Sequence, residues 1–112
     1  MKALSVRSPW AGMIADGVKT LEIRSRRTHY RGPLLICQSG GGGAVAEVVV
    51  VDCRPFGEQD DAASGGVWTL RPDARTHYAW VLRLVRRVTS APIKGRLGFY
   101  DVAEHLLRPV GP

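Results

Sequence analysis

The stretch Gly17-Val-Lys-Thr-Leu-Glu-Ile-Arg24 places a lysine, a glutamate and an arginine within six positions, next to a predicted helix end. Exposed ion pairs stabilise a fold by only about 0–1 kcal/mol each, so stability is a weak reason to gather these groups. We therefore predict that Lys19, Glu22 and Arg24 line the rim of a binding or catalytic cleft. The alternative interpretation is a cluster of ion pairs on the surface.

A short helix is predicted immediately before this stretch. Ser8 is a good N-cap and Pro9 a good first helical residue, and the apolar spacing in residues 10–14 gives the helix one hydrophobic face. Gly17 stands where a left-handed C-cap would end the helix. Residues 21–27 alternate apolar and polar, which predicts an extended segment with the charged side chains together on its polar face.

The rest of the chain has the pattern of short strands separated by turns. Strands are predicted at residues 3–6, 34–37, 44–52, 78–88 and 99–102. The run at 44–52 is apolar except for Glu47, which indicates burial on both faces, and alternate residues from Tyr78 to Leu84 are expected to share one face. Strands without regularly alternating helices predict an α+β fold, a small and mostly antiparallel barrel with one or two short helices at its mouth. The whole chain, 1–112, is expected to form a single domain.

Charge is unevenly distributed along the chain. The net charge is +6; residues 1–31 carry seven basic and two acidic groups, whereas residues 52–66 carry one basic and four acidic groups. A basic region of this kind favours an anionic partner, most commonly nucleic acid, although a nucleotide, a phosphosugar or another protein also fits. No apolar run approaches the roughly 20 residues of a membrane span, and no signal region opens the chain. We therefore expect no membrane contact and a cytoplasmic location.

The cysteines and histidines give no indication of a metal or redox centre. Cys37 and Cys53 form no C-x-x-C pair and are expected to be small buried core residues. The three histidines, His29, His77 and His105, are widely scattered. Neither a metal ion nor a cofactor is therefore predicted.

Several segments together resemble the ASCH domain (activating signal cointegrator homology), a family of the PUA-like superfamily. The segment at residues 3–11 is followed by the signature G-x-K-x-x-E-x-R, which residues 17–24 match at every fixed position. Residues 31–36, 46–52 and 95–102 are similar to later strands of that family. The chain departs from the family at Ser8, where relatives often carry glutamine, and residues 57–75 match no part of it.

The resemblance implies a PUA-like pseudobarrel with a cleft beside its first helix, lined by Lys19, Glu22 and Arg24. It also implies nucleic-acid binding, chiefly of RNA. In such a site Lys19 and Arg24 would hold phosphate or a carbonyl oxygen, and Glu22 would accept a hydrogen bond from a base amino group. RNA, another single-stranded nucleic acid, or a nucleoside or nucleotide is thus the expected partner.

Further basic and aromatic residues near the cleft extend the candidate nucleic-acid surface. These candidates are Arg26, Arg27, Tyr30, Arg31, Trp68, Lys94 and Arg96. The basic members are either a phosphate track or a solvated face, and Trp68 is either a stacking residue or the anchor of a loop. Trp10 is expected in the core, and Glu47 is expected to pair with an arginine across the barrel or to point into the cleft.

The resemblance leaves catalysis open, with Lys19 and Glu22 as the candidate catalytic residues. Certain relatives are amidohydrolases of acylated cytidine that use a lysine and a threonine three residues later, plus a distant glutamate. Here Glu22 stands in the place of the threonine, and Glu47 and Glu58 are the candidates for the third residue. A ribonuclease is a third hypothesis, although no histidine pair supports it. The sequence predicts no oligomeric state.

Overall fold

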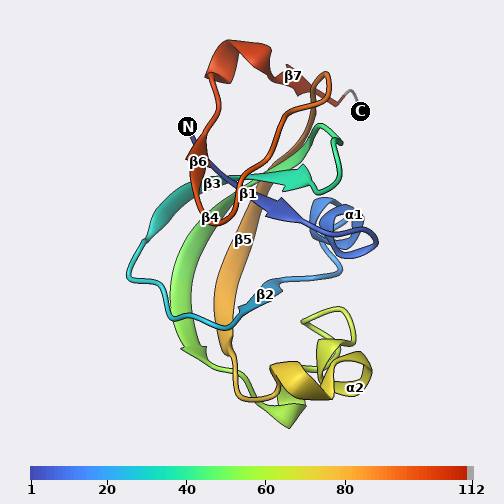
Figure 1. The fold of residues 1–112 in the computed structure, drawn as a ribbon, viewed down its shortest axis with the longest axis vertical. Coiled ribbons are helices and arrows are strands. Elements are labelled where there is room, and N and C mark those ends of the chain that lie inside the picture. The colour runs from blue at the N-terminus through green and yellow to red at the C-terminus, as the bar shows by residue number, and fades with distance from the viewer. Residues whose placement is uncertain (111–112) are drawn as a thin grey trace.

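The computed structural model describes residues 1–110, which form a curled mixed sheet with two short helices (Figure 1). The strands are β1 (Lys2–Val6), β2 (Leu21–Arg24), β3 (Gly32–Gln38), β4 (Ala44–Pro55), β5 (Tyr78–Thr89), β6 (Tyr100–Asp101) and β7 (Arg108–Pro109). The helices are α1 (Trp10–Ala15) and α2 (Val67–Leu70), with 3-10 turns η1 (Glu58–Asp60), η2 (Pro72–Ala74) and η3 (Glu104–Leu106). The predicted α+β class is confirmed. The last two residues of the predicted domain, 111–112, lie outside the described part of the chain.

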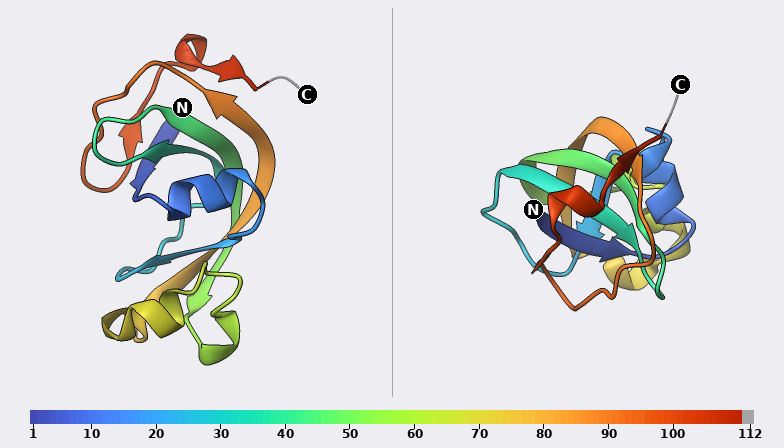
Figure 2. Two further views of the ribbon diagram at one scale, coloured as in Figure 1. Left: turned by 90° about the vertical axis from the view of Figure 1, so that its right-hand side faces the viewer. Right: turned by 90° about the horizontal axis from the view of Figure 1, so that it is seen from above.

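The sheet is mostly antiparallel, as the sequence predicted. Its strand order is β2-β5-β4-β3-β1-β6, and β7 pairs with the far end of β5. Among the described pairings only that of β1 with β3 is parallel. Figure 2 shows the long strands β4 and β5 curving around α1, which contacts both of them. The result is a half-barrel, consistent with a PUA-like pseudobarrel.

Strand β4 has one buried face and one partly exposed face. Ala44, Ala46, Val48 and Val50 are buried, and the residues between them are only half-buried. The prediction that this run is buried on both faces is therefore wrong for β4, because the main core covers only the face that carries Ala46, Val48 and Val50. A second core cluster lies on the other face of the sheet, where it buries Leu35 and Cys37 of β3. Glu47 lies on the outer face, where its Oε1 is 3.2 Å from Nε of an arginine on β5, Arg86.

On the predicted face of β5, burial extends only as far as Leu82. Leu84, expected on the buried face, is 38% exposed. The pairing of β4 with β5 shifts register twice near this point, so that Val85 on β5 and Val51 on β4 have no residue opposite them. Neither bulge lies between Leu82 and Leu84, so Leu84 keeps its face and pairs with the buried Val48. Leu84 lies beside Gly17, just beyond the end of α1, where the helix no longer covers the sheet.

Helix α1 begins one residue later than the sequence predicted. Pro9 occupies the N-cap position, with no side-chain capping bond, and the backbone N–H of Ala11 donates to the carbonyl of Arg7 at 3.0 Å. Ser8 is therefore not the N-cap, because backbone groups close this turn without its hydroxyl. The predicted C-terminal glycine is confirmed, since Gly17 has φ +79° just after the helix.

Residues 57–77 form a separate layer of short helical turns below the sheet (Figure 1). Leu21, Phe56, Val67, Ala74 and Ala79 pack together into a small core that joins this layer to the sheet. Within residues 1–110 no helix is long and apolar enough to cross a membrane.

The two cysteines differ in their surroundings. Cys37 is buried on β3, as predicted, whereas Cys53 on β4 is only partly buried against the main core. Burial raises the pKa of the Cys37 thiol. Cys37 is therefore a core residue, whereas the prediction of full burial for Cys53 is wrong, because the end of β4 lies beyond the densest part of the core.

Candidate functional site

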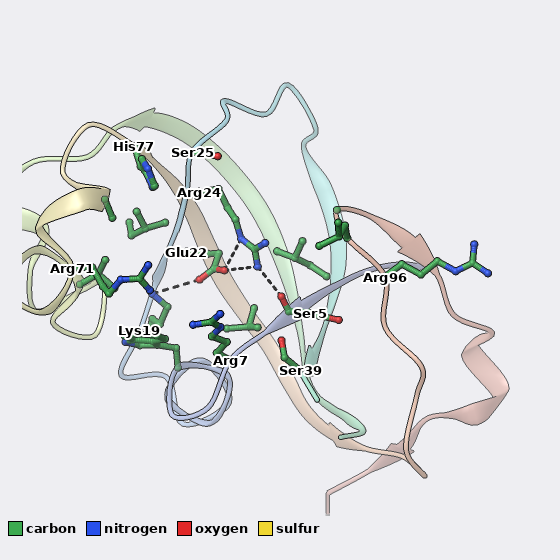
Figure 3. Close-up of a pocket in the computed structure, with 18 residues that line it drawn as sticks. Ser5, Arg7, Lys19, Glu22, Arg24, Ser25, Ser39, Arg71, His77 and Arg96 are labelled. Atoms are coloured by element: carbon green, nitrogen blue, oxygen red, sulfur yellow. Dashed lines mark hydrogen bonds and ion pairs between the residues drawn. The ribbon is translucent and has the colours of Figure 1, made fainter. Parts of the chain in front are cut away.

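A cavity of about 400 Å³ lies between the end of β1, the start of α1, strand β2 and the layer formed by residues 57–77 (Figure 3). Cationic side chains dominate its charged lining. The charged and titratable residues that line it are Arg7, Lys19, Glu22, Arg24, Arg71, His77 and Arg96. Three of these residues, Lys19, Glu22 and Arg24, are the signature residues that the sequence placed in a cleft.

Lys19 lies in the turn that joins α1 to β2 and is only 2% exposed. Its Nζ donates a hydrogen bond to the carbonyl oxygen of Ser64 at 2.6 Å and lies 3.6 Å from Oε1 of Glu22. Burial lowers the pKa of Lys19, and the nearby carboxylate of Glu22 opposes this effect only in part. The alternative of a surface ion-pair cluster is therefore wrong for Lys19.

Glu22 and Arg24 project from the same face of β2, as the period of two predicted. Nε of Arg24 donates to Oε2 of Glu22 at 2.8 Å, and Nη2 of Arg24 donates to the backbone carbonyl of Ser5 at 2.7 Å. Glu22 is 6% exposed and lies between the cations of Lys19 and Arg24 (Figure 3). The three charges form a continuous chain in which one carboxylate faces two cations.

The structure adds four cavity residues that sequence reasoning missed as site residues. Arg7 follows β1 and forms no ion pair among residues 1–110, whereas Arg71 lies 3.3 Å from Asp73. His77 also lines the cavity, and like Arg71 it belongs to the layer formed by residues 57–77. The adjacent sequence 3–11 was a signal for Arg7, but nothing in the sequence pointed to Arg71 or His77.

The fourth addition is Trp10, which was expected in the core. Its side chain is only partly buried, lines the cavity, and donates from Nε1 to the carbonyl oxygen of Gly65 at 3.1 Å. Trp10 therefore serves as a wall of the cavity, because α1 packs its apolar face on the sheet and turns its first residue towards residues 57–77.

Four of the predicted nucleic-acid residues lie outside the cavity, in the segment after β2. Arg26 and Arg27 follow the end of β2 at Arg24, where the chain leaves the sheet and the predicted extension to residue 27 stops. Tyr30 donates from its hydroxyl to the carbonyl of Pro33 at 2.6 Å. Arg31 lies 3.8 Å from Asp52. The structure thus does not bring these four residues, Arg26, Arg27, Tyr30 and Arg31, to Lys19.

Trp68 also lies outside the cavity. Its ring makes an edge contact with Phe56, with centroids 5.4 Å apart, and the guanidinium of Arg75 lies 4.9 Å from the ring centroid. These contacts identify Trp68 as the anchor of its layer. Arg96 lines the cavity, and Lys94 lines an adjoining groove.

No metal site is found in the part of the chain that the structure describes. Within residues 1–110 no three His, Cys, Asp or Glu residues lie together in a position to hold a metal ion. The chemistry that the cavity offers is therefore that of its own ammonium, carboxylate, guanidinium and imidazole groups.

A half-barrel with a charged cavity beside its first helix is the architecture of a PUA-like domain. The sequence model of the ASCH domain matches residues 4–96, which is most of the chain and includes every charged residue of the cavity. The protein therefore belongs to the ASCH domain family, a PUA-like family often linked to RNA binding. A search of curated proteins found no match.

Proposed function

We propose that this protein binds single-stranded nucleic acid, with RNA as the natural ligand, by taking one nucleotide into the cavity. The charge of the lining supports this proposal. Arg7, Arg24, Arg71 and Lys19 line the cavity, Arg96 lies at its edge, and Glu22 is the carboxylate among them. An excess of guanidinium groups fits phosphate oxygens, because the planar fork of arginine presents several donors at once.

The size of the cavity also favours a single nucleotide. Its volume of about 400 Å³ falls within the roughly 300–1,000 Å³ typical of small-ligand sites. A base would lie against apolar side chains such as Trp10 and Val67, with Glu22 accepting a hydrogen bond from an amino group. Such a site needs an unpaired base, which favours single strands over a duplex.

The observation that carries the proposal is the chain of ion pairs formed by Lys19, Glu22 and Arg24 at the cavity wall, in which Lys19 and Glu22 are buried. Burying charges costs desolvation energy, so a buried ion pair is a weak source of stability. Ligand binding compensates for this cost, because Glu22 is fixed between two cations and its carboxylate can accept hydrogen bonds from a polar ligand. Pre-organised polar groups of this kind give a binding site its specificity.

Fluorescence anisotropy with labelled single-stranded RNA, single-stranded DNA and duplex RNA tests the proposal. Arg7→Ala is the informative variant, because Arg7 is exposed, lines the cavity and has no ion-pair partner to leave behind in the described chain. Arg83→Ala is the matched control, since Arg83 is equally exposed on β5 but does not line the cavity.

We expect single-stranded RNA to bind most tightly, Arg7→Ala to weaken binding about tenfold, and Arg83→Ala to leave it unchanged. Equal losses of RNA affinity in the two variants would mean that the net charge alone causes the effect, and they would contradict a role for the cavity. Absence of binding to every probe at low salt would overturn the proposal. Gels run on the same samples report any cleavage of the RNA.

One observation favours a second candidate function, hydrolysis of N4-acylated cytidine. Lys19 is buried in the cavity with a lowered pKa, the condition under which a lysine acts as a base or nucleophile near neutral pH. The departure from the hydrolase relatives is Glu22, which occupies the position of their threonine. Chromatography of N4-acetylcytidine incubated with wild type and with Lys19→Met tests it. Release of cytidine and acetate by wild type alone would support hydrolysis, and no release would remove it.

A further inference from the structure

A second depression adjoins the cavity and belongs to different segments of the chain. It is an open groove between the turn at residues 39–41 and the loop at residues 94–97. Ser5, Ser39 and Arg96 line both the groove and the cavity, so the two spaces meet at the end of β1. A ligand that fills the cavity therefore has a continuous path into the groove.

Backbone contacts fix the two sides of this groove against each other. The N–H of Ile93 donates to the carbonyl of Gly42 at 3.1 Å, which ties the loop to the glycine turn at its base. Gly95 lies directly on Ser5, and any side chain at position 95 would collide with the Ser5 hydroxyl. The close approach at Gly95 sets the floor of the groove at β1.

The groove carries cations that nothing in the described chain neutralises. Lys94 and Arg96 are exposed and form no ion pair within residues 1–110. Figure 3 shows the side chain of Arg96 extending away from Glu22 and Arg24. Its guanidinium therefore lies apart from the ion pairs of the cavity. These two cations are therefore free to bind an anionic group beyond the one that the cavity holds.

The groove also offers an apolar contact and an open surface of backbone. Leu97 is fully exposed, at 101% of its reference area, at the junction of groove and cavity. Gly40 and Gly41 have positive φ values of +84° and +87°, and a Cβ on either would meet no atom within 4 Å. A nucleotide fits this arrangement, because its phosphate can bind the two cations while the flat face of its base packs on the exposed leucine.

We propose that the groove is a second nucleotide subsite, which holds the nucleotide next in the strand to the one in the cavity. Lys94 and Arg96 bind its phosphate, and its base or ribose packs on Leu97. This inference rests on the proposed function, because the cavity must hold the first nucleotide. The smallest ligand that uses the whole site is then a dinucleotide rather than a mononucleotide.

Isothermal titration with the four nucleoside 5′-monophosphates and the four 5′-phosphorylated homodinucleotides tests the subsite. We expect the best dinucleotide to bind at least tenfold more tightly than its mononucleotide. Lys94→Ala should remove about tenfold of dinucleotide affinity and leave mononucleotide affinity unchanged, whereas Arg83→Ala should alter neither. Lys94 is exposed, so its removal is not expected to disturb folding.

The outcomes separate this inference from the function on which it rests. A dinucleotide that binds no more tightly than its mononucleotide would overturn the subsite and leave the cavity as a one-nucleotide site. Equal loss of mononucleotide and dinucleotide affinity in Lys94→Ala would also overturn it, because Lys94 would then act on the cavity. Failure of all eight probes to bind would overturn both proposals.

Discussion

Lys19 is a buried lysine with two fixed partners, the carbonyl of Ser64 and the carboxylate of Glu22. Its ammonium replaces water with one short hydrogen bond and one ion pair, which satisfies the charge without cancelling the cost of burial. The sign of its pKa shift shows that burial outweighs the attraction of Glu22. The ammonium of Lys19 is therefore less stable in the folded protein than in water.

The lowered pKa of Lys19 predicts a pH dependence of stability. The unfolded chain binds this proton more tightly than the folded chain, so the free energy of unfolding rises with pH between the folded pKa and the usual value of 10.5. In Lys19→Met this contribution is absent. We expect the stability of wild type relative to Lys19→Met to increase as the pH is raised from 7 towards 10, with a slope of at most about 1.4 kcal/mol per pH unit.

Urea denaturation of both proteins at several pH values measures this difference. Taking the difference removes the opposite contribution of Tyr100, whose pKa burial raises to about 12. A relative stability that stays flat or falls over this range would show that the folded protein does not lower the pKa of Lys19.

At the level of elements, the layer formed by residues 57–77 completes a cavity that the sheet alone leaves open. It supplies the carbonyl that holds Lys19, the carbonyl that holds Trp10, and the side chains of Arg71 and His77. Backbone bonds from Thr20 and Leu21 to the carbonyl of residue 63 attach it to the start of β2. The position of this layer therefore sets the width of the site.

Gly65→Ala is predicted to disturb this attachment. Gly65 has φ +79°, and an added Cβ would lie 2.8 Å from Cδ1 of Trp10, which is too close for the wall of the cavity to remain in place. Gly40→Ala is the matched control, with a similar φ of +84° and open space around the new carbon. Left-handed strain destabilises both variants by about 1–2 kcal/mol, and the contact adds about 1–3 kcal/mol in Gly65→Ala alone.

Chemical denaturation of the two glycine variants gives the comparison, and anisotropy with single-stranded RNA shows whether the cavity is altered. Gly65→Ala should lose both stability and affinity. Equal destabilisation of the two variants would mean that the layer moves away from Trp10 without cost.

Across the whole molecule, charge is arranged so that basic groups gather at one opening. The cavity and the groove together present Arg7, Arg71, Lys94 and Arg96 near the buried Lys19 and the half-buried Arg24. Acidic residues of the 52–66 region are engaged elsewhere, as in the pair formed by Arg54 with Asp60 at 2.7 Å. The approach to the site is therefore electropositive, which favours anionic ligands at long range.

This arrangement predicts a salt-dependent affinity for single-stranded RNA. Each phosphate contact contributes about −0.7 to the slope of log K against log salt concentration, because binding releases condensed counterions. Arg7→Ala should make the slope about 0.7 less steep, and Arg83→Ala should not change it. Anisotropy titrations between about 50 and 200 mM salt provide the slopes. A slope near zero in wild type would exclude phosphate contacts.

Local features of the site and fold were predictable because their causes lie within a few residues. Gly17 ends α1 since it alone there tolerates the left-handed conformation, and the period of two along β2 places Glu22 beside Arg24. Predictions from local sequence were wrong where the surroundings of a side chain come from residues distant in the chain. Leu84 is exposed although it pairs with the buried Val48, because it lies just beyond the end of α1. Tyr30 packs against Phe99, and Trp68 packs against Phe56.

The sequence by itself determined six of the seven described strands, the first helix, the ASCH signature and the adjacency of Glu22 and Arg24, whereas the terminal strand β7 was not predicted. Only the tertiary structure decided that Lys19 is buried and that its partner is Ser64, 45 positions away. It also decided that Arg7, Arg71 and His77 share the cavity. The physical reason is that desolvation depends on every segment packed around a group, and any residue's backbone carbonyl can accept a hydrogen bond, so this partner is not visible in the sequence.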